Sequence, residues 1–150
     1  MLRKAFIGLI SFALLTIITL SSLTSQVSAM PTCSNETLKG LYVHTSSGFR
    51  GTAAPFIPLA TLRTAEIQNG KVKGRGTLSL GGDVKNYRVE GTYEVSSDCT
   101  VIFSHSAISD DGSISQASKH FGIIVDRGKK VYYIQQTPGI NETGIYEKIS

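Results

Sequence analysis

The sequence predicts an all-β fold, namely a small antiparallel barrel of eight strands joined as a meander, with a short N-terminal helical turn before it. Apolar and polar residues alternate with a period of two along most of the chain after residue 40, as they do in half-buried strands. Turn-forming residues interrupt this alternation at short intervals. The nearly unbroken meander favours a closed barrel over a sandwich, because closure leaves no strand edge exposed.

The first 29 residues are predicted to be a signal peptide. Arg3 and Lys4 form a short positive segment, residues 5–20 are an apolar run, and small residues precede a cleavage point after Ala29. An uncleaved membrane anchor is the alternative, but this run is short for a span of about 20 residues. We therefore expect an exported protein, periplasmic or extracellular, in which residues 30–150 form a single barrel domain.

Length and charge exclude some functions. About 120 residues remain after the leader, which is close to the usual size of one domain with one core. The full chain has a formal net charge of +4, but Arg3 and Lys4 belong to the leader, so the exported part carries about +2. This weak charge argues against nucleic acid as a partner. Once the leader is removed, we expect no membrane partner either.

Export would place Cys33 and Cys99 in an oxidising compartment, where two cysteines permit a single intramolecular disulfide. Closing a loop of roughly 66 residues would stabilise the fold by roughly 4 kcal/mol in the chain-entropy model. A metal site or a catalytic thiol is the alternative. Neither cysteine has a second Cys or a His at the spacing of metal ligands, so the structural bridge is favoured.

The elements follow in chain order. A helical turn is predicted from Ser34, a favourable N-cap residue, to Gly40, a favourable C-terminal residue. Turn signals then divide the chain at Asn69-Gly70, 81–83, 96–98, 110–112, Arg127-Gly128 and 137–139. The predicted strands cover residues 41–49, 59–68, 71–80, 85–95, 99–107, 115–126, 129–136 and 143–149.

The two-residue turn at Asn69-Gly70 predicts the register of one hairpin, in which Gln68 pairs with Lys71. That register places Arg63 on the packed face, opposite Gly76. A buried guanidinium costs several kcal/mol unless it is paired. Three interpretations follow for Arg63: a bulge turns it outward, it pairs with an internal carboxylate, or it anchors an anion or polar ligand. Glycines on the packed face, at positions 74, 76 and 91, indicate strongly bent strands.

A second hairpin turns at Arg127-Gly128 and pairs Asp126 with Lys129. Both of its faces are apolar, although a monomeric barrel buries only one. The second face is therefore expected to pack on another subunit of a homo-oligomer, or to be covered by the N-terminal turn or by loops. One face carries His120, Gly122, Ile124, Val131, Tyr133 and Gln135, and the other carries Phe121, Ile123, Val125, Tyr132 and Ile134.

Two motifs resemble those of a family of small exported bacterial proteins. Residues 33–42, Cys-Ser-Asn-Glu-Thr-Leu-Lys-Gly-Leu-Tyr, are similar to the family's opening turn, and residues 91–100, Gly-Thr-Tyr-Glu-Val-Ser-Ser-Asp-Cys-Thr, to its central segment. The hairpin at Asn69-Gly70 is also similar, so the resemblance spans most of the exported part. It implies a barrel similar to allene oxide cyclase and the lipocalin-like calycins, with Cys33 and Cys99 as the motif cysteines. It implies no established activity, and no catalytic residue is carried over from the plant cyclases.

Motifs of common enzymes and cofactor sites are missing from the sequence. It contains no nucleophile elbow, phosphate-binding loop, His-Glu-x-x-His or paired-cysteine zinc motif, so we expect no cofactor and no metal. His44, His105 and His120 are scattered, which is typical of single surface or core histidines rather than of a metal site. The side of the strand on which His105 lies depends on the length of the loop around Cys99, which the sequence leaves open.

Three hypotheses for the function remain. The first is a binding barrel that holds a small apolar or amphipathic ligand in its lumen, with Arg63, His120, Tyr133 and Gln135 as polar anchors. The second is a packed barrel that acts through its outer surface as an envelope or extracellular interaction module. The third is an isomerase or cyclase, which would need a catalytic group that the sequence does not identify. We prefer the binding barrel, a function without catalysis.

Overall fold

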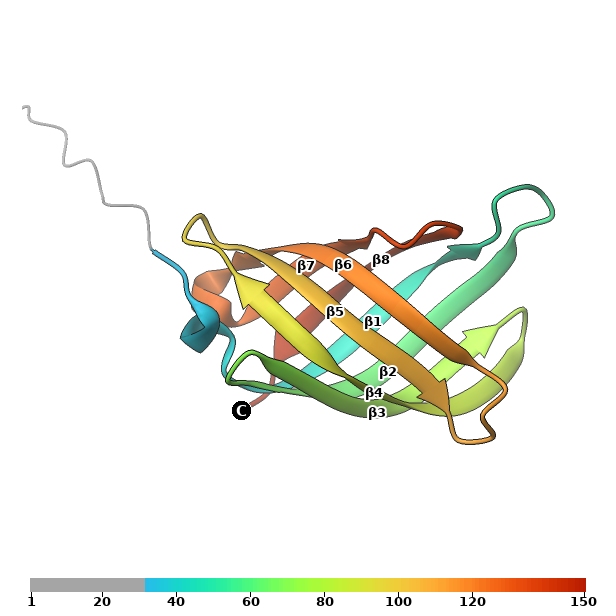
Figure 1. Ribbon diagram of the computed structural model, residues 1–150, viewed down its shortest axis with the longest axis horizontal. Helices are drawn as coiled ribbons and strands as arrows, with labels where there is room; N and C mark the ends of the chain where they lie inside the picture. The colour runs from blue at the N-terminus through green and yellow to red at the C-terminus, as the bar shows by residue number, and fades with distance from the viewer. Residues whose placement is uncertain (1–31) are drawn as a thin grey trace, which may run out of the picture. The chain divides into compact units, whose positions relative to one another are not determined.

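The structure is a computed structural model in which residues 32–150 are described, so the predicted signal peptide lies outside the described residues. This part of the chain forms a closed barrel of eight antiparallel strands in chain order, in which β8 pairs with β1 (Figure 1). Two short 3-10 turns, η2 (Asn35–Leu38) and η3 (Asp126–Gly128), lie outside the sheet. The strands are β1 (Gly40–Arg50), β2 (Ile57–Gln68), β3 (Lys71–Leu80), β4 (Asp83–Val95), β5 (Thr100–Ser109), β6 (Ser115–Val125), β7 (Lys130–Gln135) and β8 (Ile140–Lys148).

The predicted fold class is confirmed, and each predicted strand is present with its ends shifted by no more than a few residues. The largest shift is at β8, which begins at Ile140 rather than at residue 143. Ile140 pairs with Arg50, the last residue of β1, so closure of the barrel extends both strands beyond their predicted ends. Because β1 and β8 are far apart in the sequence, no local sequence pattern indicates where their pairing begins and ends.

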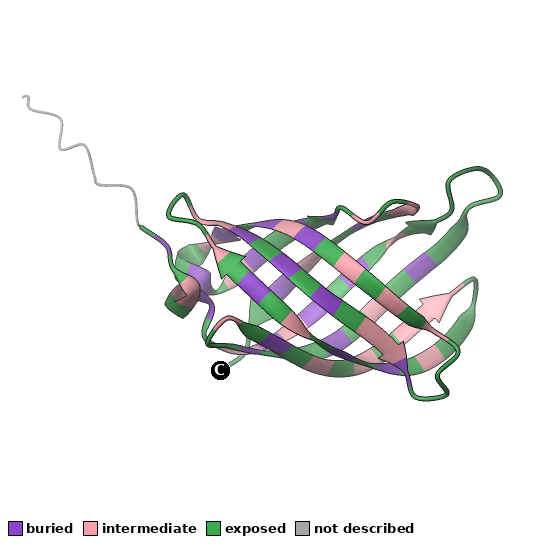
Figure 2. Ribbon diagram, viewed as in Figure 1, coloured by how far each residue is buried: buried purple, intermediate pink, exposed green. Residues whose placement is uncertain are grey.

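One end of the barrel is filled by side chains and closed by η2. Alternate residues of each strand point inward, so buried and exposed positions alternate along the strands in Figure 2. The disulfide between Cys33 and Cys99 holds the segment before η2 against the turn between β4 and β5. The hydrophobic core at this end includes Leu38, Tyr42, Ile67, Val72, Val101, Phe103 and Val131, all of which are almost completely buried.

Both predicted hairpin registers are confirmed. Gln68 pairs with Lys71, and Arg63 lies opposite Gly76. The β6–β7 hairpin places His120 opposite Gln135, as its turn predicts. Arg63 is only 4% exposed, so no bulge turns it outward.

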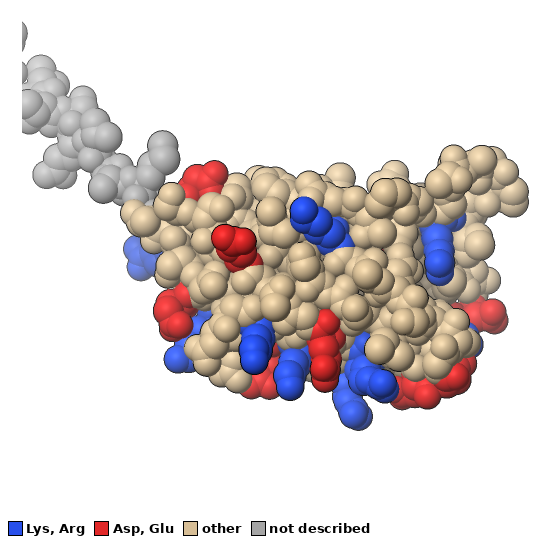
Figure 3. Space-filling model, in the orientation of Figure 1, with Lys and Arg blue, Asp and Glu red and all other residues tan. Residues whose placement is uncertain are grey.

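The outer surface has a charged side and an apolar side. Figure 3 shows acidic and basic side chains gathered in the lower part of the view, where Figure 1 places β3 and β4. The outer face of β6 and β7 carries Ile123, Tyr132 and Ile134, which are 52%, 54% and 49% exposed. Because these side chains are half open to solvent, neither the N-terminal turn nor a loop covers them.

Candidate functional site

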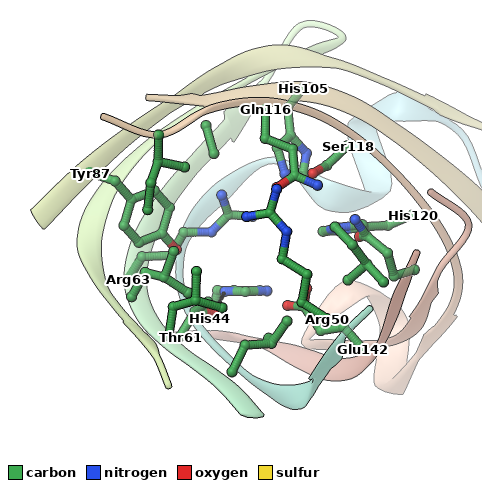
Figure 4. Close-up of a pocket in the computed structure, with 17 residues that line it drawn as sticks. His44, Arg50, Thr61, Arg63, Tyr87, His105, Gln116, Ser118, His120 and Glu142 are labelled. Carbon is green, nitrogen blue, oxygen red and sulfur yellow. Dashed lines mark hydrogen bonds between the residues drawn. The ribbon is translucent and has the colours of Figure 1, made fainter. Parts of the chain in front are cut away.

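The barrel lumen is open at the end opposite η2. It contains a cavity of about 70 Å³, which has room for several water molecules or for the head group of a ligand that continues into the mouth. Figure 4 shows side chains from around the barrel pointing into this space. Near the mouth the walls are largely apolar and consist of Leu59, Leu78, Leu80, Ala107, Ile114 and Ile140. Arg63 and the histidines lie deeper in the lumen. Three other polar residues, Arg50, Gln116 and Glu142, lie at the strand levels of the apolar residues, because Arg50 pairs with Ile140, Gln116 with Ala107, and Glu142 with Gly48 opposite Leu59.

Arg63 is the buried positive charge of the lumen. Its Nη2 atom donates a hydrogen bond to the Tyr146 hydroxyl at 2.5 Å, and its guanidinium lies 5.6 Å from the centre of the Tyr146 ring. The Nε atom is buried and has no hydrogen-bond partner. Burial works against the charge, but the neighbouring tyrosines, Tyr146 foremost, outweigh it and raise the pKa of Arg63. The guanidinium therefore remains charged in the lumen.

No carboxylate among residues 32–150 forms an ion pair with Arg63. The ion pairs among residues 32–150 join Lys39 to Glu36, Lys85 to Asp111 and Lys130 to Glu147, and all of these side chains are at least one-third exposed. The expectation of an internal carboxylate partner is therefore wrong, although a carboxylate, Glu142, does lie in the lumen. Its Oε1 atom accepts a hydrogen bond from the Tyr133 hydroxyl at 3.1 Å.

Three histidines surround this charge. His44, His105 and His120 all line the cavity, and each is less than 10% exposed. Burial, followed by the positive charge of Arg63, lowers the pKa of His120 to about 3 and holds the pKa of His44 and of His105 well below the usual value. All three rings are therefore neutral at pH 7, and each nitrogen is either a donor or an acceptor.

A chain of hydrogen bonds fixes the tautomer of His44. The Tyr133 hydroxyl is 2.6 Å from His44 Nε2 and donates its one proton to Glu142. His44 must therefore donate from Nε2 and accept at Nδ1, where the Thr61 hydroxyl lies at 3.3 Å. Ser46 completes the chain at 2.5 Å from Thr61. Burial and the nearby Glu142 raise the pKa of Tyr133 far above its usual value, so this hydroxyl stays protonated.

The structure brings the four predicted site residues together. Arg63, His120 and Gln135 line the cavity. Tyr133 lies behind the wall, where its ring stacks on His120 with the ring centres 4.3 Å apart. The structure therefore places these four residues close together, but their role in binding stays a prediction.

Four other residues that line the cavity were not predicted as anchors from the sequence, namely His44, His105, Arg50 and Glu142. His44 lies opposite Arg63 in the β1–β2 ladder, and the connection between those strands carries no tight-turn signal that would fix their register. His105 faces inward because Ser96 donates its backbone N–H to Thr100, which leaves residues 97–99 as a three-residue loop in which Cys99 has a positive φ of 65°. Arg50 and Glu142 lie at or beyond the predicted ends of their strands.

Some classes of site are missing from the described part. Within residues 32–150, no group of three or more His, Cys, Asp or Glu residues is arranged to hold a metal ion. The helical turns of the same residues include none that is long and apolar enough to cross a membrane. Comparison with protein families, curated proteins and solved structures gives no match for this chain. The resemblance to small exported bacterial proteins therefore stays a prediction.

Proposed function

We propose that the barrel binds a small amphipathic molecule in its lumen. The observation that carries this proposal is a cluster of buried polar atoms without hydrogen-bond partners. Within the described residues these are Arg63 Nε, His105 Nδ1, His120 Nδ1 and Gln135 Oε1, and all four belong to residues that line the cavity. An unsatisfied buried polar group costs about 1–3 kcal/mol.

The distribution of these atoms argues against a barrel that is merely packed. A packed core would hold apolar side chains here, as the η2 end of the same barrel does. Instead, the unpartnered donors and acceptors belong to residues that line a cavity whose other lining residues are partly apolar. A few convergent polar groups within an apolar cavity are typical of a site for a small molecule. A ligand with one polar end and an apolar body would satisfy both regions.

Two variants test the location of binding. Ala107 lines the cavity, whereas Ala117 is exposed on the outside of the neighbouring strand, so Ala107→Phe fills the lumen and Ala117→Phe adds the same ring outside. Native mass spectrometry of protein purified gently from its own host would look for a retained small molecule. Fluorescence titration with two compact probes, the neutral indole and the anionic indoxyl sulfate, would measure affinity, because the chain contains no Trp whose emission would overlap with theirs.

We expect at least one probe to bind the wild type and Ala117→Phe with the same affinity. Its affinity for Ala107→Phe should be at least tenfold weaker, because the added ring occupies the cavity. Equal binding to all three proteins would place the probe on the outer surface and would contradict a lumenal site. Failure of both probes to bind, together with no retained molecule, would favour the packed interaction module.

A further inference from the structure

We infer that the lumenal ligand is a compact aromatic or alicyclic monocarboxylate, which enters with its carboxylate towards Arg63 and leaves its apolar body near the mouth. This inference rests on the proposed function and adds the chemical class and the orientation of the ligand.

The charge of the lumen favours an anion. Arg63 is almost completely buried, and it has hydrogen-bonding and aromatic partners but no ion pair. The side chain of Arg50 also points into the lumen in Figure 4 and lines the same cavity, although Arg50 is an exposed residue at the mouth, where solvent screens its charge. The histidines are neutral at pH 7, so Glu142 is the negative charge that opposes two arginines among the residues that line the cavity. One monoanion would balance this set.

The free donors suit a carboxylate. One terminal nitrogen of the Arg63 guanidinium binds Tyr146, but the Nε–H is free. A guanidinium presents its N–H groups as a planar fork, which matches the two oxygens of a carboxylate. His105 and His120 lie with ring centres 4.6 Å apart, and each has an unpartnered Nδ1. When that nitrogen carries the proton, it is a further donor to the anion.

The position of Glu142 explains why its negative charge does not already neutralise Arg63. Its carboxylate accepts a hydrogen bond from Tyr133, whose hydroxyl also contacts His44. Glu142 is therefore held by the neutral Tyr133 instead of by an arginine. Its charge should still weaken the binding of a second carboxylate in the same lumen, because like charges repel strongly in a buried site.

The size and the walls of the cavity fix the shape and the direction of the ligand. The enclosed part of the cavity measures about 70 Å³, less than the roughly 150 Å³ of a cavity that holds benzene, so it accepts a carboxylate head group while the ring of the ligand lies in the open mouth. Arg63 lies four residues along β2 from Leu59, which is about 13 Å along the strand. Leu59 pairs with Leu80, and the next inward pair, Thr61 and Leu78, lies between them and Arg63. The apolar body of a ligand bound to Arg63 would therefore lie against these leucines.

Three matched ligands test the charge of the head group. Isothermal titration calorimetry of the full exported protein with 4-butylbenzoate, 4-butylbenzyl alcohol and 4-butylbenzylamine compares an anion, a neutral molecule and a cation of the same shape. We expect the benzoate to bind at least tenfold more tightly than the alcohol and the amine to bind most weakly. Equal affinities for benzoate and alcohol would overturn the anion inference and leave the lumenal site intact. If none of the three binds and the fluorescent probes do, the inference is likewise wrong.

Variants of Arg63 and Glu142 test whether these two residues cause the preference for the benzoate over the alcohol. In Arg63→Met the benzoate should lose its advantage over the alcohol, while the alcohol keeps its affinity within about threefold. In Glu142→Gln the benzoate should bind more tightly and the alcohol should not change. Arg63→Lys retains the charge without the planar fork, so it should lose part of the preference for the benzoate over the alcohol. This variant provides the test if Arg63→Met does not fold. A benzoate preference that persists in both Arg63 variants would contradict the assignment.

Discussion

Gly76 lies directly opposite Arg63 in the β2–β3 ladder, and a Cβ atom on Gly76 would come within 2.4 Å of the Cβ atom of Arg63. Such an atom would also lie 2.1 Å from the backbone oxygen of Leu62, which cannot move aside without disturbing the sheet. The next strand continues the row with Tyr87, another residue of the cavity wall. The glycine therefore allows a tightly curved sheet to hold an arginine inside the barrel.

The first prediction follows from this contact. Gly76→Ala should lower the free energy of unfolding by about 1–3 kcal/mol, because the backbone must shift to accept the methyl group. The displacement should also move Arg63 and weaken ligand binding. Urea unfolding would measure the loss, with Thr77→Ala on the exposed face of the same strand as the control. A Gly76→Ala variant as stable as that control would contradict the close approach.

The second prediction is that Arg63 is a cost to stability. The double variant Arg63→Met/Tyr146→Phe removes a buried charge and the hydroxyl that binds it, and leaves no group of that pair unpaired. We expect its free energy of unfolding to exceed that of the wild type by about 1–3 kcal/mol, since apolar replacements of buried charged pairs are often stabilising. Urea unfolding without ligand provides the measurement. A loss of stability would show that Arg63 serves the fold rather than a ligand.

The inward position of Arg63 could be predicted from the sequence because a two-residue turn fixes the register of its hairpin. The same holds for His120 and Gln135, which share the β6–β7 hairpin. Tight turns act locally, so a few residues determine which side chains face inward along a whole strand pair.

The rest of the site depends on contacts that are distant in sequence. His44 joins it through the β1–β2 ladder, whose strands are connected by residues 51–56 without a tight turn. Glu142 joins it through the closure of β8 on β1, where Glu142 pairs with Gly48. No local pattern specifies either register, so the hydrogen-bond chain from Glu142 to His44 had no signal in the sequence.

The third prediction concerns the disulfide. It joins residues 66 positions apart, and a link of this span stabilises a fold by roughly 4 kcal/mol in the chain-entropy model. The double variant Cys33→Ala/Cys99→Ala should therefore lose about 2–4 kcal/mol of unfolding free energy. Ligand binding should be unchanged at temperatures where the variant is folded, because neither cysteine lines the cavity. Two titratable thiols in unreduced wild-type protein would contradict the bridge.

The fourth prediction concerns the apolar outer face of β6 and β7, which we propose as a contact between copies of this chain. Ile123 pairs with Tyr132, and Ile134 is the next outward residue of β7. The variant Ile123→Lys/Ile134→Lys should shift the protein towards monomer in sedimentation velocity at micromolar concentration. Leu62→Lys, at a residue that is 55% exposed on β2, is the matched control and should not change the distribution. A monomeric wild type would refute self-association through this face.

The last prediction is a loss of stability in mild acid. In the folded protein the pKa of His120 is about 3, and those of His44 and His105 are also well below 6.5, because burial and the charge of Arg63 oppose their protonation. In the unfolded chain each histidine takes up a proton near pH 6.5. Between these values the unfolded state holds more protons, so the free energy of unfolding falls as the pH decreases, by up to about 1.4 kcal/mol per pH unit for each histidine.

Urea unfolding between pH 7.5 and pH 4.5 measures this slope. Above about pH 7 it should be nearly flat, because the histidines are then neutral in both states. The pKa of Asp111 is held below its usual value by hydrogen bonds from Lys85, Ser109 and Ser113, so its titration falls at lower pH than that of the unfolded histidines. His120→Gln should reduce the slope below pH 6.5 by one histidine's share. A stability that does not change from pH 7 to pH 5 would show that the three rings take up protons in the folded protein as readily as in the unfolded chain, and Arg63 would then lie among three further cations at pH 5.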